Sequence, residues 1–176
     1  MYLIVTRTFP PELGGMQSLM WGLSRELSKN FMIKVFANYV EGHKDFDNQA
    51  SFSIERVGGI KLLRKYRKAQ LINEFIKDNK IEGIIADHWK SLELIKSSKK
   101  KYCLIHSKEI NHPKGSSLNK RVLNVLNNVE KVIANSKFTK NLAIQCGVNE
   151  NNIIVINPGI DPAKELDKRT MNKVES

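Results

Sequence analysis

Short apolar runs alternate with amphipathic segments along most of this sequence, and this alternation constrains the fold more than any other feature. The apolar runs, found between residues 2 and 156, are mostly continuous and not interrupted by polar residues. Continuous apolar runs are typical of strands that are buried on both faces. Strands that alternate with helices favour a parallel sheet. We therefore predict an α/β fold with a doubly wound, mostly parallel, Rossmann-like sheet.

The apolar and amphipathic patterns locate the individual elements. We expect strands at residues 2–6, 31–37, 52–57, 81–86, 102–105, 131–134 and 153–156, with 52–57 as a candidate edge strand. We expect helices at residues 16–29, 61–79, 90–97, 118–129 and 137–146, and a loop at 38–49. Residues 1–161 are expected to form one domain. Residues 162–176 are charged and lack apolar periodicity, so we expect a linker or tail there.

The net charge of +11, from 29 basic and 18 acidic residues, favours anionic partners. No apolar run reaches the length of a membrane span, and the N-terminus lacks the features of a signal peptide. We therefore expect a cytoplasmic protein. Cys103 and Cys146 belong to no C-x-x-C motif, and free thiols are expected in a reducing compartment.

Residues 9–16 form the loop expected between the first strand and the first helix. Pro10 and Pro11 stiffen it, and Gly14 and Gly15 remove the side chains where the helix begins. A helix start offers unpaired N–H groups and partial positive charge, so an anion such as a diphosphate could approach this backbone closely. A stiff turn with two glycines chosen for backbone geometry is the alternative. The loop lacks the G-x-G-x-x-G fingerprint, which disfavours a dinucleotide site.

Polar side chains follow two later strands directly. His106 follows the strand at 102–105, and Asn135 and Ser136 follow the strand at 131–134. Ligands of parallel sheets bind beyond the carboxyl ends of the strands, so we expect these residues to converge with Gly14 and Gly15 on one edge. His106 could donate a hydrogen bond to a substrate, or its ring could be satisfied by neighbouring backbone. Ser136 is in either case well placed to cap a helix.

Other candidate chemistry is weaker. Asp87 and His88 follow the strand at 81–86, where the carboxylate could orient the imidazole, although an exposed turn is the simpler interpretation. Together with Cys103 and His106 these residues do not have the spacing of a known zinc site, so no metal site is predicted. The sequence has no G-x-S-x-G motif and no P-loop, which disfavours hydrolases and nucleoside triphosphatases.

Five basic residues crowd the first two turns of the helix expected at 61–79, namely Lys61, Arg64, Lys65, Arg67 and Lys68. Like charges at this end oppose the helix dipole. We expect this basic patch to contact an anionic acceptor or an anionic membrane surface, with a solvated lysine-rich face as the alternative. Few aromatic residues are interleaved with the charges, so nucleic acid is not an expected partner.

Several of these segments together resemble a known family. The segments are FPPELGGM at 9–16, VIANSKFT at 132–139, CGV at 146–148 and IIVINPGID at 153–161. In order and spacing they are similar to the N-terminal part of the group 1 (family 4) glycosyltransferases, and the resemblance runs from about residue 2 to residue 161. It implies the GT-B arrangement of two Rossmann-like domains that face each other across a cleft.

The resemblance also implies an activity and roles for residues. It implies transfer of a sugar from a nucleotide-sugar donor to an acceptor, with retention of configuration and without a metal or other cofactor. Gly14 and Gly15 would lie against the donor diphosphate, His106 near the donor sugar, and Asn135 and Ser136 at the cleft wall.

The sequence departs from the family in one respect, because the second domain, with its basic pair and spaced glutamates, is absent. We therefore expect the N-terminal, acceptor-side half of an enzyme, inactive alone, whose partner would be the missing C-terminal domain. It would use a saccharide or lipid-linked acceptor at the inner membrane face, in cell-surface polysaccharide or glycolipid synthesis. The alternative is a non-enzymatic Rossmann-like module that binds a ligand or a protein.

Overall fold

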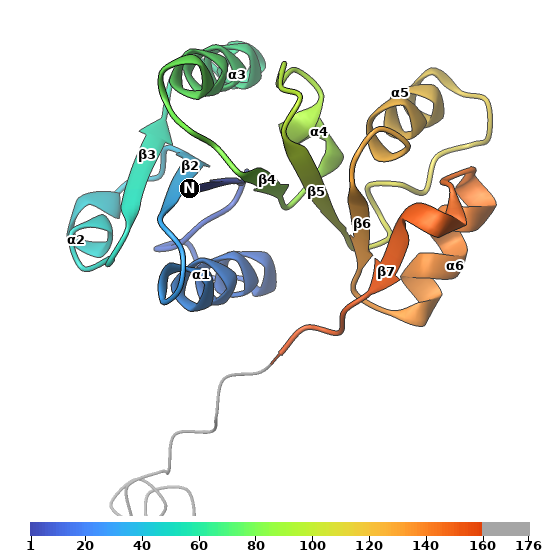
Figure 1. The fold of residues 1–176 in the computed structure, drawn as a ribbon, viewed down its shortest axis with the longest axis horizontal. Coiled ribbons are helices and arrows are strands. Elements are labelled where there is room, and N and C mark those ends of the chain that lie inside the picture. The colour runs from blue at the N-terminus through green and yellow to red at the C-terminus, as the bar shows by residue number, and fades with distance from the viewer. Residues whose placement is uncertain (160–176) are drawn as a thin grey trace, which may run out of the picture.

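A single parallel sheet of seven strands forms the centre of the structure, a computed structural model that describes residues 1–159 (Figure 1). The strands are β1 (Tyr2–Val5), β2 (Ile33–Asn38), β3 (Ser53–Val57), β4 (Gly83–Ala86), β5 (Lys100–Ile105), β6 (Lys131–Ala134) and β7 (Ile153–Val155). Their order in the sheet is β3-β2-β1-β4-β5-β6-β7, and every neighbouring pair is parallel. The predicted doubly wound sheet is confirmed, as is the edge position of β3.

Helices cover both faces of the sheet. They are α1 (Gly15–Ser28), α2 (His43–Asp47), α3 (Lys61–Asp78), α4 (Trp89–Leu92), α5 (Ser117–Leu126) and α6 (Lys137–Cys146), with the 3-10 turn η1 (Glu150–Asn152) before β7. Met20 of α1 and the partly buried Phe46 of α2 belong to one apolar core. Ile72 of α3, Trp89 of α4 and Ala143 of α6 belong to the other, and Figure 1 shows α1 and α3 on opposite sides of the sheet. Successive strands are added on one side from β1 to β3 and on the other side from β4 onward, so the strand order reverses between β1 and β4, where ligands of such sheets bind.

Local signals in the sequence place several helix ends correctly. The Ser116 hydroxyl oxygen accepts a hydrogen bond from the backbone N–H of Asn119, and Ser136 caps α6 in the same way. Gly147 ends α6 with a left-handed backbone at φ 102°, a conformation that glycine adopts without a Cβ clash. Cys103 and Cys146 are buried free thiols, as predicted.

Tertiary contacts change other expectations. The segment expected as a loop at 38–49 contains the short helix α2, whose Phe46 packs against Trp21 at a ring distance of 4.7 Å. The helix expected at 90–97 ends at Leu92. Beyond it the Asn73 side chain of α3 donates to the Leu94 carbonyl oxygen and accepts from the Lys96 N–H. These backbone groups are thus paired with a side chain and not with each other in a helix.

Two further findings concern the described part of the chain. Within residues 1–159 no helix combines the length and the apolar character that a membrane crossing requires. The expected domain boundary at 161 and the expected tail at 162–176 lie outside the described residues.

Candidate functional site

The carboxyl ends of four adjacent strands, β1, β4, β5 and β6, bring the predicted site residues to one edge of the sheet. Gly14 and Gly15 close the loop after β1, and His106 follows β5. Asn135 and Ser136 follow β6. All strands are parallel, so these segments leave the sheet on the same side. The topology thus places the predicted segments together, which sequence spacing alone does not establish.

Asp87, directly after β4, fixes the beginning of the loop that follows β1. Its carboxylate accepts hydrogen bonds from the Thr6 hydroxyl at 2.8 Å, the Arg7 backbone N–H at 2.8 Å and the Ser91 hydroxyl at 3.1 Å. Asp87 is 4% exposed and Thr6 is fully buried. A buried carboxylate with three donors holds its neighbours firmly. Asp87 therefore positions the loop and does not orient the His88 ring.

Arg56 of β3 holds the middle of the same loop. Its guanidinium donates to the Pro10 carbonyl oxygen, and it forms an ion pair with Asp47 at 2.7 Å. The guanidinium carbon lies 5.4 Å from the centre of the Phe9 ring, which is itself buried. The peptide bond between Pro10 and Pro11 is cis. The loop is therefore fixed by Arg56 of β3, which Asp47 of α2 holds in turn, and no local pattern in the sequence indicates these contacts.

The start of α1 is open. Gly14 and Gly15 are both exposed, no side chain caps this helix, and its first turn carries no acidic residue. Apart from adjacent residues and the backbone of α1, a Cβ atom added at Gly15 would have no atom within 4 Å, and the nearest atoms to one at Gly14 belong to the flexible side chain of Gln17. The helix, which is 14 residues long, thus presents its N-terminal N–H groups to free space. Such an end can accept an anion.

His106 and Asn135 contact each other across the ends of β5 and β6. The Asn135 amide nitrogen lies 3.4 Å from His106 Nδ1, and the Asn135 amide oxygen accepts from the Thr139 hydroxyl at 2.6 Å. An amide nitrogen only donates, so Nδ1 accepts and the proton of the neutral ring is on Nε2. This Nε2 is buried and has no hydrogen-bond partner within residues 1–159. Buried polar atoms are usually hydrogen-bonded, so this unpaired N–H marks the site as a candidate for ligand binding.

The backbone next to His106 is unusual and firmly anchored. Ser107 has φ 97°, the one positive value among the described residues other than glycine. The backbone N–H of His106 donates to the Glu109 carboxylate, and the Glu109 carbonyl oxygen accepts from the Trp89 ring nitrogen at 2.9 Å. Strained backbone that is fixed by its surroundings is typical of functional sites. The sequence carried no signal for this feature.

Lys68 corrects one part of the predicted basic patch. The residue is 5% exposed, and its ammonium group donates to the Thr6 carbonyl oxygen at 2.7 Å and to the Asn38 side-chain oxygen at 2.8 Å. Burial lowers the pKa of Lys68 to about 8, although the nearby Asp87 carboxylate opposes this shift. Lys68 is therefore an internal support of the loop after β1 and not part of an exposed patch. Lys61, Lys65 and Arg67 are exposed, and Arg64 is half-buried.

His88 is half-buried and caps α4. Its Nδ1 accepts a hydrogen bond of 3.0 Å from the Lys90 backbone N–H. Burial, and then the charges of Arg7 and Lys90, lowers the pKa of His88 to about 3. The ring is therefore neutral at pH 7 and acts as a hydrogen-bond acceptor within the fold. The exposed-turn interpretation of His88 is wrong for this reason.

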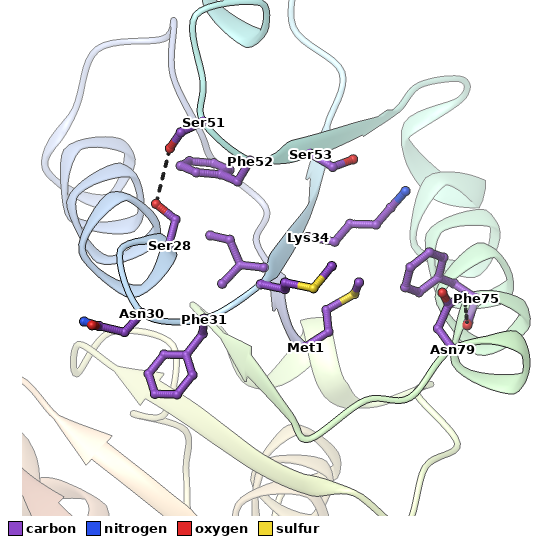
Figure 2. Close-up of a pocket in the computed structure, with 12 residues that line it drawn as sticks. Met1, Ser28, Asn30, Phe31, Lys34, Ser51, Phe52, Ser53, Phe75 and Asn79 are labelled. Carbon is purple, nitrogen blue, oxygen red and sulfur yellow. Dashed lines mark hydrogen bonds between the residues drawn. The ribbon is translucent and has the colours of Figure 1, made fainter.

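A wide hollow lies away from this edge. It has a volume of about 650 Å³ and is lined at the amino-terminal ends of β1, β2 and β3 by residues that include Phe31, Lys34 and Phe75 (Figure 2). The hollow contains none of the predicted site residues. Within residues 1–159, no three histidine, cysteine, aspartate or glutamate side chains are grouped so that they could hold a metal ion.

Comparison with known protein families shows which family this chain belongs to. The family model described as Glycosyltransferase Family 4 matches residues 13–164. The chain belongs to glycosyltransferase family 4. The match includes the start of α1, His106 and the Asn135-Ser136 pair, so the resemblance predicted from the sequence is confirmed. No curated protein matches the chain.

Solved structures agree with the fold of the family 4 chain. Anabaena Alr3699/HepE, solved in complex with UDP, is 18% identical with a TM-score of 0.69, and the match covers 91% of this chain and 44% of that one. A glycosyltransferase from Rickettsia africae ESF-5 is 17% identical with a TM-score of 0.71 and coverages of 98% and 48%. UDP-GlcNAc 2-epimerase from Methanocaldococcus jannaschii is 15% identical with a TM-score of 0.59 and coverages of 90% and 46%.

The family 4 chain thus spans about half the length of these structures. Its sheet corresponds to one half of the GT-B fold, as predicted. At these identities the likeness concerns the fold, and the epimerase shows that this fold is not restricted to sugar transfer.

Proposed function

We propose that this chain is the acceptor-side half of a glycosyltransferase that moves a sugar from a nucleotide-sugar donor to an acceptor, with retention of configuration. One observation carries the proposal: the open start of α1 and the unpartnered Nε2 of His106 lie on the same edge of the sheet in the described part of the chain. Family membership supports the reaction class, and the UDP present in the Anabaena structure supports the donor class.

The start of α1 would bind the donor diphosphate. Its N–H groups carry partial positive charge, and apart from adjacent residues and the backbone of α1 itself no described atom lies within 4 Å of the position that a Gly15 Cβ would occupy. Negative charge develops on the diphosphate as it leaves the sugar, and fixed N–H dipoles stabilise this charge. The bonds from Asp87 and Arg56 keep the loop in position before the donor arrives. No metal ion takes part in this proposal.

His106 would position the donor sugar. Its Nε2–H is the one donor of the ring that residues 1–159 do not use, and a sugar hydroxyl is a suitable acceptor. Asn135 fixes the ring through Nδ1, and Thr139 fixes the Asn135 amide. The asparagine at the cleft wall is thus a positioning residue that acts through His106.

The acceptor would be a saccharide or lipid-linked saccharide used in the synthesis of a cell-surface polysaccharide or glycolipid. The remaining donor contacts would come from a second domain on the other side of the cleft, because the chain spans about half of each GT-B structure that it matches. The chain alone would then bind the donor weakly and transfer little or no sugar.

Titration with UDP-glucose, followed by NMR of the 176-residue chain, tests the donor site. We expect shifts of the Gly15 and Met16 amide signals and of the His106 ring signals. At Gly15 a new side chain meets open space, so Gly15→Trp should abolish these shifts while the fold is kept. Gly22→Trp, in the same helix and equally free of close neighbours, is the matched control and should leave them unchanged. UDP-glucose shifts that survive Gly15→Trp would overturn the diphosphate assignment.

Transfer itself requires a parent enzyme that carries both domains. In that protein we expect Gly15→Trp and His106→Ala each to lower kcat by about 100-fold or more. Unchanged transfer in both variants would contradict the roles proposed for Gly15 and His106. Absence of transfer by the unsubstituted parent would instead favour the non-enzymatic Rossmann-like binding module.

A further inference from the structure

The first two turns of α3, with the residue before them, expose a set of large apolar side chains. Ile60 is 70% exposed, Leu62 80%, Leu63 60% and Tyr66 54%. Leu62 and Tyr66 share one helical stripe with Ala69 and Ile72, because these residues recur at spacings of three and four. Of this stripe, Ala69 and Ile72 are buried, whereas Leu62 and Tyr66 face solvent. The first two turns of α3 therefore expose apolar side chains together with the basic ones. We call residues 60–67 the α3 face.

The α3 face points away from the sheet. The buried side of the helix is marked by Lys68 and Ile72. Each helical residue turns by about 100°, so Leu63 and Tyr66 lie about 140° and 160° from Lys68 around the axis. These side chains therefore cannot join the core without rotation of the whole helix. Leaving such large apolar side chains exposed to water costs free energy, and an exposed group of them is typical of an interaction surface.

Basic side chains surround the exposed apolar ones. Lys61, Lys65 and Arg67 are exposed, and the Lys65 ammonium lies 4.7 Å from the centre of the Tyr66 ring. Residues 60–67 include no aspartate or glutamate. Arg64 donates to the Gly59 carbonyl oxygen at 3.0 Å, which joins this face to the turn before α3. Apolar residues flanked by lysine and arginine are typical of helices that lie in a membrane interface.

The positive charge continues from the α3 face to the edge that holds the candidate site. Lys90, at the start of α4, is exposed, and its pKa is lowered by partial burial and then by the charges of Arg7, Arg121 and Lys65. Glu93 faces the same group, but its carboxylate is occupied by Arg121 at 2.6 and 2.8 Å. Lys90 and its cationic neighbours Lys65 and Arg7 thus form a positively charged region, in which the nearby carboxylate of Glu93 is already paired with Arg121.

We propose that the α3 face docks on an anionic lipid bilayer, with Ile60, Leu62, Leu63 and Tyr66 at the level of the acyl boundary and the basic side chains at the lipid phosphates. The exposed apolar residues favour a bilayer over a soluble anion, and the basic residues favour acidic headgroups. Because α3 starts at the carboxyl end of β3, docking turns the edge with Gly15 and His106 toward the lipid surface. A lipid-linked acceptor in that surface would then lie beside the cleft.

This inference goes beyond the proposed function, because binding to a bilayer needs neither donor nor acceptor. Vesicle binding and donor binding are measured separately, so failure of one is distinguishable from failure of the other.

Co-sedimentation with vesicles tests the proposal on the 176-residue chain. We expect binding to an equal mixture of phosphatidylcholine and phosphatidylglycerol, no binding to phosphatidylcholine alone, and weaker binding as salt is raised. The double variant L62S/L63S should bind the mixed vesicles about tenfold more weakly. The triple variant K61Q/K65Q/R67Q should lose about fivefold in affinity per charge.

Matched controls separate the α3 face from general charge and general apolar character. Met32→Ser removes another exposed apolar side chain, 72% exposed at the amino-terminal edge, and should bind like the wild type. K77Q/K96Q/K99Q removes three exposed lysines outside the α3 face and should keep most of the binding. Equal loss in this control and in K61Q/K65Q/R67Q would overturn the proposal. So would wild-type binding by L62S/L63S, or absence of binding by the wild type to mixed vesicles, in which case the α3 face would belong to a protein contact.

Discussion

The ammonium group of Lys68 donates a hydrogen bond of 2.7 Å to the backbone carbonyl oxygen of Thr6, which connects α3 to the loop after β1. A second bond, to the Asn38 side chain, adds the end of β2 to the same group. The Asp87 carboxylate accepts a hydrogen bond of 2.8 Å from the hydroxyl of the same Thr6. A buried cation and a buried anion thus fix the loop that precedes the open start of α1.

The burial of Lys68 makes stability depend on pH in a defined window. Its pKa is lowered from 10.5 to about 8, so between these values the unfolded chain binds more protons than the folded one. The free energy of unfolding of the wild type, relative to that of Lys68→Met, should therefore rise between pH 8 and pH 10.5, by about 3 kcal/mol in total. Urea denaturation of both proteins across this range measures the difference. The exposed Lys65→Met is the control, and a constant difference between wild type and Lys68→Met would contradict the burial of the charge.

Removal of the Asp87 charge should destabilise the fold. In Asp87→Asn one carboxylate oxygen becomes an amide nitrogen, which cannot accept. Either the oxygen that accepts from Thr6 and Arg7 or the oxygen that accepts from Ser91 is therefore lost, and Lys68 loses a nearby buried anion. We expect a loss of about 2–4 kcal/mol in the free energy of unfolding. Asp78→Asn, at an exposed position, should change it by less than about 0.5 kcal/mol. Chemical denaturation at pH 7 distinguishes these outcomes, and an equal effect of the two variants would show that Asp87 is not an anchor.

The ring of His106 should be a single tautomer in the free protein. Because Asn135 donates to Nδ1, the proton should be on Nε2. Nitrogen-15 NMR of the imidazole identifies the protonated nitrogen directly. Asn135→Ala should produce a mixture of both tautomers, whereas Asn141→Ala, at an exposed position of α6, should leave the ring unchanged. A dominant Nδ1–H form in the wild type would contradict the proposed role of Nε2.

Two glycine-to-alanine substitutions should change the free energy of unfolding in opposite directions. Gly147→Ala places a Cβ 3.2 Å from Leu123 in a backbone with φ 102°, so we expect a loss of about 1–2 kcal/mol in the free energy of unfolding. Gly22 lies inside α1, where an added Cβ would have no atom within 4 Å, and Gly22→Ala should stabilise the protein by about 0.5–1 kcal/mol. Thermal denaturation of both variants measures the two effects. A stabilising Gly147→Ala would show that the end of α6 relaxes away from Leu123.

Features that depend on neighbouring residues were predictable. The strand at 131–134 and the cap at Ser136 follow from apolar runs and from a hydroxyl next to a helix start. The gathering of Gly15, His106 and Asn135 on one edge follows from parallel topology, since each lies in a segment that leaves the carboxyl end of a strand.

Other features depend on partners that lie far apart in the chain. The sequence placed Lys68 with the other basic residues of α3, because charge alone predicts exposure. Its partners Asn38 and Thr6 lie 30 and 62 residues away, and no local pattern indicates that they meet. The same holds for Arg56, which binds the Pro10 carbonyl oxygen from 46 residues away.

By itself the sequence determined the parallel α/β sheet, the family and the edge that carries the candidate site, because these follow from periodicity and from the order of the strands. Only the tertiary structure decided which side chains hold the loop after β1 and which apolar residues of α3 remain outside the core. Those outcomes depend on how α3 is rotated against the sheet. Packing of Ile72 and the bonds of Lys68 fix that rotation, and it leaves Leu63 and Tyr66 facing solvent.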